Sequence, residues 1–205
     1  MRLGLLGPAR DSSETLERAA RFLLCDLGVD RAVYLDVDHA LDAVVRRWAE
    51  RLVAGDPRED AIWQRATERC LRATPEEIQE FIAAERERHA LKIFHSLAGD
   101  AARSIEILAG RVAVLIHDKD DLDEEDLLPA SFLVFGASAE PVVKSVGDRW
   151  FLSPGTLEHF GVMTLDDRDD GVHLTLYDSE CREVRRQPLV SEPAPPGQAG
   201  GEPRA

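Results

Sequence analysis

The spacing of apolar residues changes once along this chain, and the change limits the folds that the chain can adopt. Residues 2–6 form a short apolar run, residues 13–27 have apolar residues at helical spacing, and residues 31–37 form a second apolar run. This order predicts a strand, a helix and a parallel second strand joined by a right-handed crossover. After Gly99 the spacing is that of strands in seven successive segments. We therefore expect an α/β fold with two packed mixed sheets and helices outside them.

The middle of the chain is predicted to be helical. Residues 38–54 have an apolar face, and two further helical stretches follow at about 58–72 and 75–97, the second capped by Thr74 with Pro75 at its first position. The apolar faces within residues 56–98 are larger than surface helices need. We interpret 56–98 as an inserted helical segment, which either packs on the sheets or serves a protein partner or self-association.

The length and composition predict one domain followed by a tail. A chain of 205 residues with 44% hydrophobic content can bury one sizeable core and is too short for two ordinary domains. From about Pro188 the sequence is rich in Pro, Gly and Ala. We expect a single domain over residues 1–187 and a disordered tail over 188–205.

The charge of the chain argues against polyanionic partners. Thirty-nine acidic residues against 25 basic ones give a formal net charge of −14, which repels nucleic acids and anionic membranes. The opening run "LGLLG" is too short for the apolar region of a signal peptide, and no stretch approaches the ~20 apolar residues of a membrane span. The three cysteines are widely separated, as is typical of reduced thiols. We expect an acidic, cytoplasmic protein that binds neither nucleic acid nor membrane.

Five loops that follow predicted strands form a recognisable series: "LGLLGPARDSSETLERA", "VYLDVDH", "RVAVLIHDKDD", "FLVFGASAEPVV" and "FLSPGTL". In this order they resemble the loops of the calcineurin-like metallophosphoesterase superfamily, in its small single-domain bacterial branch. The resemblance covers residues 1–45 and about 105–184. It implies a four-layer α-β-β-α sandwich and, in active members, hydrolysis of phosphate esters at two metal ions.

The family's metal ligands are mostly replaced in this sequence. Pro8 and Arg10 stand where the family has aspartate and histidine, Val37 stands for a bridging aspartate, and Ala137 and Ala139 stand for two histidines. Asp36 and Asp118 occupy positions of family glycines, and the asparagine-bearing loop is missing. Of the ligand positions that can be aligned, only His117 is retained, and one imidazole does not hold two divalent ions.

These observations predict a former active site that has lost its chemistry. The positions of this vestigial or ligand-binding pocket are Pro8, Arg10, Asp36, Val37, Asp38, His117, Asp118, Gly136, Ala137, Ala139, Ser153 and Gly155. We expect no catalytic residues, no metal and no cofactor there. The favoured function is that of a pseudoenzyme acting as a protein-binding or regulatory module, for which a retromer subunit with this family's fold is a precedent.

Two other functions stay open at this point. Asp36, Asp38, His39, His117 and Asp118 follow two strands and provide ligands for a rebuilt site for Mn or Zn, which would make the protein a metal-dependent phosphoric ester hydrolase. Against this, Asp36 or Asp38 can cap the next helix, and residues 118–126 read as a solvated acidic loop.

The third function is a non-hydrolysing binder of a phosphorylated ligand. It would use Arg10 and the loops at Gly136 and Gly155. Ser138 beside His117 would suggest a nucleophile, but the sequence shows no third group to orient the histidine.

Overall fold

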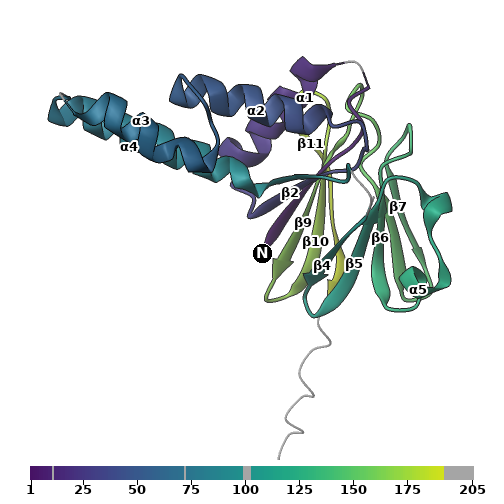
Figure 1. The fold of residues 1–205 in the computed structure, drawn as a ribbon. Coiled ribbons are helices and arrows are strands. Elements are labelled where there is room, and N and C mark those ends of the chain that lie inside the picture. Colours follow the sequence, from purple (N-terminus) through teal and green to yellow (C-terminus); the bar gives the residue numbers. More distant parts are fainter. Residues whose placement is uncertain (11, 72, 99–102, 192–205) are drawn as a thin grey trace, which may run out of the picture.

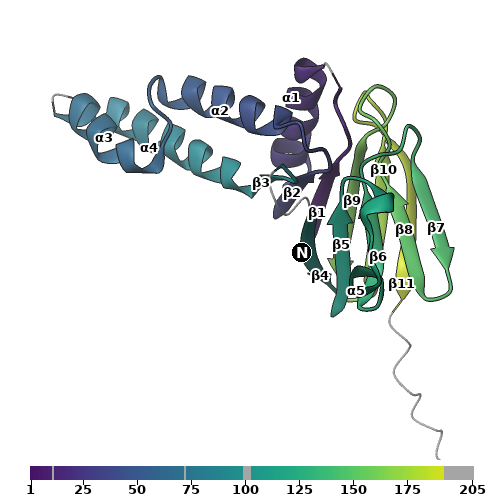
Figure 2. The same ribbon diagram turned by 45° about the vertical axis from the view of Figure 1, so that its right-hand side comes forward.

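Two mixed sheets pack face to face in the computed structural model, which describes residues 1–10, 12–71, 73–98 and 103–191 (Figures 1 and 2). Sheet A has the order β11-β10-β9-β1-β2-β3, and sheet B has the order β4-β5-β6-β8-β7. The strands of sheet A are β1 Arg2–Leu6, β2 Arg31–Tyr34, β3 Phe94–Ser96, β9 Val162–Arg168, β10 Gly171–Tyr177 and β11 Glu183–Ser191. Those of sheet B are β4 Arg103–Leu108, β5 Arg111–Ile116, β6 Ala130–Phe135, β7 Val142–Val146 and β8 Arg149–Ser153.

The opening strand-helix-strand unit forms as the sequence predicts. β1 pairs with β2 in parallel, with Leu3 opposite Arg31, and with β9 in antiparallel orientation. Between β1 and β2 lies α1 (Ser13–Arg21), capped by the side chain of Ser12 and extended by a π-helical turn over Phe22–Asp26. Strand β1 is buried on both faces from Leu3 to Leu6. This explains why it reads as a continuous apolar run.

Three apolar cores separate the layers. One lies between the two sheets and includes Leu5 of β1 and Phe132 of β6. A second joins the outer face of sheet A to α1 and to α2 (Ala40–Val53), and a third covers the outer face of sheet B with the chain around α5 (Glu124–Leu127). The predicted α/β sandwich is confirmed, and its fourth layer is reduced to α5 and the 3-10 turn Lys119–Asp121.

The inserted segment forms a helical hairpin that projects from the sheets (Figures 1 and 2). It consists of the 3-10 turn Glu59–Ala61, α3 Ile62–Cys70, α4 Pro75–Ala90 and the 3-10 turn Leu91–Ile93. Thr74 caps α4 in a capping box with Glu77, and Pro75 is the first residue of the helix, as predicted.

Two predicted boundaries are wrong. The helix expected to reach residue 97 ends at Ala90, because Phe94–Ser96 pairs in parallel with β2 as the edge strand β3. Residues 188–191, expected to belong to the tail, are instead the end of strand β11, which continues through Pro188 to Ser191. Pro188 is tolerated there because β11 is an edge strand, where a missing N–H costs no ladder bond. Residues 192–205 of the predicted tail lie outside the described residues.

None of the helices in the described ranges is long and apolar enough to cross a bilayer.

Candidate functional site

The loops that resemble the family's site gather at the carboxyl ends of β1, β2, β5, β6 and β8, where they are joined by main-chain hydrogen bonds. The amide of Gly7 donates to the carbonyl of Gly161 at 2.7 Å, and that of Leu157 donates to Pro8 at 3.0 Å. The amide of Ala137 donates to the carbonyl of His117 at 2.7 Å. The loops of the two sheets therefore form one cluster, as the sequence predicts.

Two glycines bring the loops into backbone contact. A Cβ added to Gly136 would lie 1.9 Å from the carbonyl oxygen of Leu35, and one added to Gly7 would lie 1.8 Å from that of Gly155. No side chain larger than hydrogen fits at these separations. The loop after β2 in sheet A thus rests directly on the loop after β6 in sheet B. The main chain, rather than side chains that could bind an ion, fills the space at both contacts.

His117, the retained ligand of the family pattern, is held by the opposite sheet. Its Nδ1 lies 3.0 Å from the carbonyl oxygen of Leu35 and 3.4 Å from a carboxylate oxygen of Asp36. Donation from Nδ1–H to Leu35 leaves Nε2 as the nitrogen with a free lone pair. Asp36 lies beside Nδ1, on the wrong edge of the ring to share an ion with Nε2. The two residues come together as the sequence predicts, and the hydrogen bond to the main chain of Leu35 fixes the ring beside Asp36.

The other residues of the rebuilt-metal hypothesis are engaged elsewhere. Asp38 accepts hydrogen bonds from the hydroxyl of Tyr34 at 3.2 Å and from the amide of Ala40, the first residue of α2, at 2.9 Å. His39 pairs with Asp42 at 3.0 Å on the surface. Asp118 accepts from the amide of Asp120 at 3.1 Å and caps a 3-10 turn. Within the described part of the chain, no group of three or more His, Cys, Asp or Glu residues is arranged to hold a metal ion.

The buried hydroxyl of Tyr34 connects two of these loops. It accepts a hydrogen bond from the amide of Ala9 at 3.1 Å and donates to Asp38. Burial raises the pKa of Tyr34, with a smaller contribution from the nearby carboxylates, so the hydroxyl remains a donor at neutral pH. Tyr34 and Leu35 were not among the predicted site residues, and their position at the end of a buried strand is the signal that could have found them.

The remaining predicted positions have few side-chain groups that could bind a ligand or a metal ion. Ala137, Ala139 and Val37 are exposed, whereas Pro8, Gly136, Ser153 and Gly155 are buried. In the last of these loops the amide of Gly155 donates to the hydroxyl of Ser153 at 3.2 Å and closes the turn.

Two polar side chains at this cluster, Arg10 and Ser138, already have partners within the chain. Arg10 is exposed and pairs with Glu158 at 3.3 Å. The hydroxyl of Ser138 donates to the carbonyl of Glu140 at 2.7 Å, whereas the His117 ring contacts Leu35 and Asp36. These contacts do not form the nucleophile and base pair that Ser138 would need.

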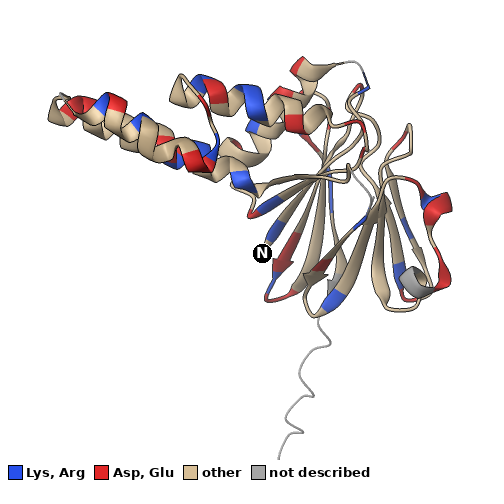
Figure 3. Ribbon diagram, viewed as in Figure 1, with Lys and Arg blue, Asp and Glu red and all other residues tan. Residues whose placement is uncertain are grey.

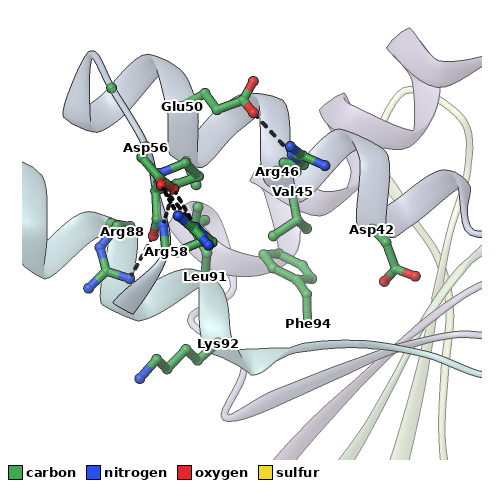
Figure 4. Close-up of a pocket in the computed structure, with 13 residues that line it drawn as sticks. Asp42, Val45, Arg46, Glu50, Asp56, Arg58, Arg88, Leu91, Lys92 and Phe94 are labelled. Atoms are coloured by element: carbon green, nitrogen blue, oxygen red, sulfur yellow. Dashed lines mark hydrogen bonds and ion pairs between the residues drawn. The ribbon is translucent and has the colours of Figure 1, made fainter. Parts of the chain in front are cut away.

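A separate groove of about 1110 Å³ lies between α2, the loop 55–58 and the end of α4 (Figure 4). Val45, Leu91 and Phe94 give it an apolar floor, and charged side chains line its rim. Each basic side chain of the lining has a carboxylate partner: Arg46 with Glu50, Arg58 with Asp56, Arg88 with Glu85, and Lys92 with Glu59. The hydrogen bond from Arg58 lowers the pKa of Asp56 to about 2. The cations of the groove are therefore all paired with carboxylates of the same chain.

No protein-family model matches the chain, and no curated protein is similar to it in sequence. Solved structures do share its fold. YfcE, a phosphoesterase from E. coli, has a TM-score of 0.53 and 14% identity over 93% of this chain and 100% of that chain. A single mutant of Vps29 from Entamoeba histolytica has a TM-score of 0.50 and 12% identity over 87% and 92%. A predicted phosphoesterase from Streptococcus pneumoniae has a TM-score of 0.50 and 9% identity over 91% and 98%.

These similarities span nearly the whole of each compared chain. The protein therefore has the fold of the calcineurin-like metallophosphoesterases, as the resemblance of its loops predicts. Sequence identities of 9–14% establish the fold alone.

Proposed function

We propose that the protein is a catalytically degenerate metallophosphoesterase-like protein that acts as a protein-binding or regulatory module. The observation that carries the proposal is the set of contacts that His117 makes. Its Nδ1 is bonded to the main chain of Leu35, Asp36 lies beside the same nitrogen, and no third ligand accompanies them in the described part of the chain. Two-metal hydrolysis needs several oxygen and imidazole donors around ions ~3.5–4 Å apart.

The contacts between the loops support the same proposal. Main-chain atoms of Leu35 and Gly155 occupy the positions where side chains of Gly136 and Gly7 would otherwise lie. Exposed alanines take the place of the family's two histidines on the β6 loop. The loop cluster therefore provides a surface that lacks the set of metal ligands needed for two-metal hydrolysis. Such a surface suits recognition of another protein better than hydrolysis.

The test combines metal analysis with hydrolysis. The purified full chain is dialysed against Mn²⁺ or Zn²⁺, its metal content is measured, and its turnover of bis-p-nitrophenyl phosphate is followed. We expect no stoichiometric metal and no turnover, with His117→Ala identical to the wild type. About one tightly bound ion per chain, with turnover that His117→Ala abolishes and the surface control His89→Ala retains, would refute the proposal and establish the rebuilt site.

Binding of a phosphorylated ligand without turnover is the other candidate. Arg10, its main cation, is already paired with Glu158 at the surface. We therefore expect inorganic phosphate and phosphoserine to leave the thermal midpoint unchanged. A concentration-dependent rise that Arg10→Ala removes would instead establish this function.

A further inference from the structure

A further cavity lies on the outer face of sheet B, beside the edge strand β7, and we call it the β7 pocket. Its volume is about 500 Å³, which is typical of pockets that hold small organic ligands. Its described lining comes from the segment that leads into α5, from α5 itself, and from strands β6, β7 and β8. None of the predicted site positions is among these residues, so the β7 pocket and the loop cluster use different side chains.

The walls of the β7 pocket are mostly apolar. Residues of β7 alternate between its two faces, so Val143 packs into the core between the sheets while Lys144 and Val146 line the pocket. Behind β7 the pocket reaches the apolar core on the outer face of sheet B. In the described part of the chain, the helical layer over this face is reduced to α5 and one 3-10 turn, which leaves the side next to β7 open. The apolar lining consists of Leu122, Leu127, Phe135, Val146 and Phe151.

Two of the three lysines in the sequence line this pocket. Lys119 lies in the 3-10 turn and Lys144 lies in the middle of β7, so they reach the pocket from different elements. Neither ammonium group forms an ion pair or a hydrogen bond with a residue that the structure describes. The third lysine, Lys92, pairs with Glu59 at 2.6 Å. Two cations on apolar stems are thus available to a ligand in the β7 pocket.

The acidic segment that leads into α5 limits the positive charge of the pocket (Figure 3). Residues 118–126 contain seven acidic residues, of which Asp120 is in the described lining. The carboxylate of Asp118 is turned back to the amide of Asp120. The described lining therefore has two ammonium groups and one carboxylate. A ligand with a single negative charge neutralises this set, whereas the acidic segment repels a ligand with several.

We propose that the β7 pocket binds a small apolar monocarboxylate. Its carboxylate would lie beside Lys119 and Lys144, and its apolar part would lie against Phe135 and Phe151. The two phenylalanine side chains favour an aromatic group over an alkyl chain. Burial of the apolar part supplies most of the binding free energy, while the lysines select for the charge and fix the orientation.

This inference does not depend on the proposed function, because its test measures binding rather than turnover and changes no predicted site position. The probe is 4-phenylbutyrate, titrated into the purified full chain by isothermal titration calorimetry, and 4-phenylbutyramide is its uncharged counterpart. We expect the carboxylate to bind at one site per chain and the amide to bind more weakly. A rise in NaCl concentration should weaken binding of the carboxylate and leave that of the amide unchanged.

The lysines are tested by methionine, which keeps an unbranched apolar stem without the charge. Exposed ion pairs are weak, so Lys119→Met and Lys144→Met should each lower the affinity for 4-phenylbutyrate by roughly fivefold. Neither should change the affinity for the amide. The matched control is Lys92→Met, because Lys92 already pairs with Glu59 and is not part of the lining. It should bind 4-phenylbutyrate as the wild type does.

A second pair of variants compares the two faces of β7. Val146 and Ser145 are both exposed, so glutamate at either position should leave the chain folded. Val146→Glu places a carboxylate in the pocket and should weaken binding of 4-phenylbutyrate by more than roughly tenfold. Ser145→Glu makes the same change of charge on the opposite face of the strand and should weaken it by less than about twofold.

Three results would overturn the proposal. The first is the absence of saturable binding of 4-phenylbutyrate at millimolar concentrations. The second is equal affinity for the carboxylate and the amide, which would mean that the lysines do not contact the ligand. The third is unchanged affinity in both Lys119→Met and Lys144→Met, or equal losses in Val146→Glu and Ser145→Glu, which would place the bound probe elsewhere on the protein.

Discussion

Gly136→Ala tests whether the loop cluster is closed by main-chain contact. The added methyl group would lie 1.9 Å from the carbonyl oxygen and 2.8 Å from the carbonyl carbon of Leu35. Neither atom can move freely, because Leu35 follows a central strand and its amide donates to the carbonyl of Leu6 at 2.8 Å. The two loops must therefore separate, and His117 must release its hydrogen bond to Leu35.

The expected cost follows from these two effects. Overpacking of a closed site costs about 1–3 kcal/mol, and loss of the bond from His117 adds about 1 kcal/mol. We expect the free energy of unfolding to fall by about 3 kcal/mol, which lowers the thermal midpoint of a domain of this size by about 6–12 °C. Urea unfolding followed by circular dichroism measures the change.

Gly55→Ala is the matched control, because its Cβ would meet only the carbonyl oxygen of Val53 at 3.9 Å. We expect its stability to change by less than about 1 kcal/mol. If Gly136→Ala were as stable as Gly55→Ala, the loops would not be in backbone contact, and the structural argument against a functional metal site would lose its basis.

Two further predictions concern charged residues. Glu85→Ala leaves the buried guanidinium of Arg65 without its carboxylate and that of Arg88 with Glu59 at 3.6 Å, and it should lower the free energy of unfolding by about 3–5 kcal/mol, whereas the exposed control Glu87→Ala should change it by less than about 0.5 kcal/mol. Burial alone would raise the pKa of Asp166, but hydrogen bonds from Arg2 and Arg168 bring that pKa below its ordinary value. The folded state thus favours the carboxylate, so this stabilisation is complete above the unfolded pKa of about 3.9 and is lost as the pH falls through the lower folded value. Urea unfolding from pH 7 to pH 2 should show a shallower acid decline for Asp166→Asn than for the wild type, and equal slopes would contradict the assignment.

The sequence predicts the fold well where the apolar period is unambiguous. The parallel pairing of β1 and β2, the helix after Ser12 and the strands of sheet B follow from spacing and caps. β11 was not predicted because its sequence "EVRRQPLVS" contains charges and Pro188, which an edge strand tolerates and a central strand does not. β3 was assigned to the preceding helix because three residues are too few to show a period, and only pairing with β2 makes them a strand.

The candidate site was predicted in part. The sequence indicates which loops meet and that Asp36 and His117 lie near one another, and the structure places them 3.4 Å apart. It does not indicate that the partner of His117 is the main-chain carbonyl of Leu35. Every residue has a main-chain carbonyl, so the residue type gives no sign of which one accepts a hydrogen bond. The groove at the base of the hairpin was also not predicted, since it depends on how α4 packs against α2.

The position of β1 in the middle of sheet A affects how the chain can fold. Its parallel neighbour β2 is about 30 residues away in sequence, but its antiparallel neighbour β9 pairs Asp166 with Arg2, across most of the chain. The pairing of β1 with β9 at the centre of sheet A therefore cannot form until β9 has been synthesised, while α3 and α4 can pair locally much earlier. Long-range pairing of this kind slows folding, so during synthesis the apolar first strand remains without its antiparallel neighbour until residues 162–168 have left the ribosome.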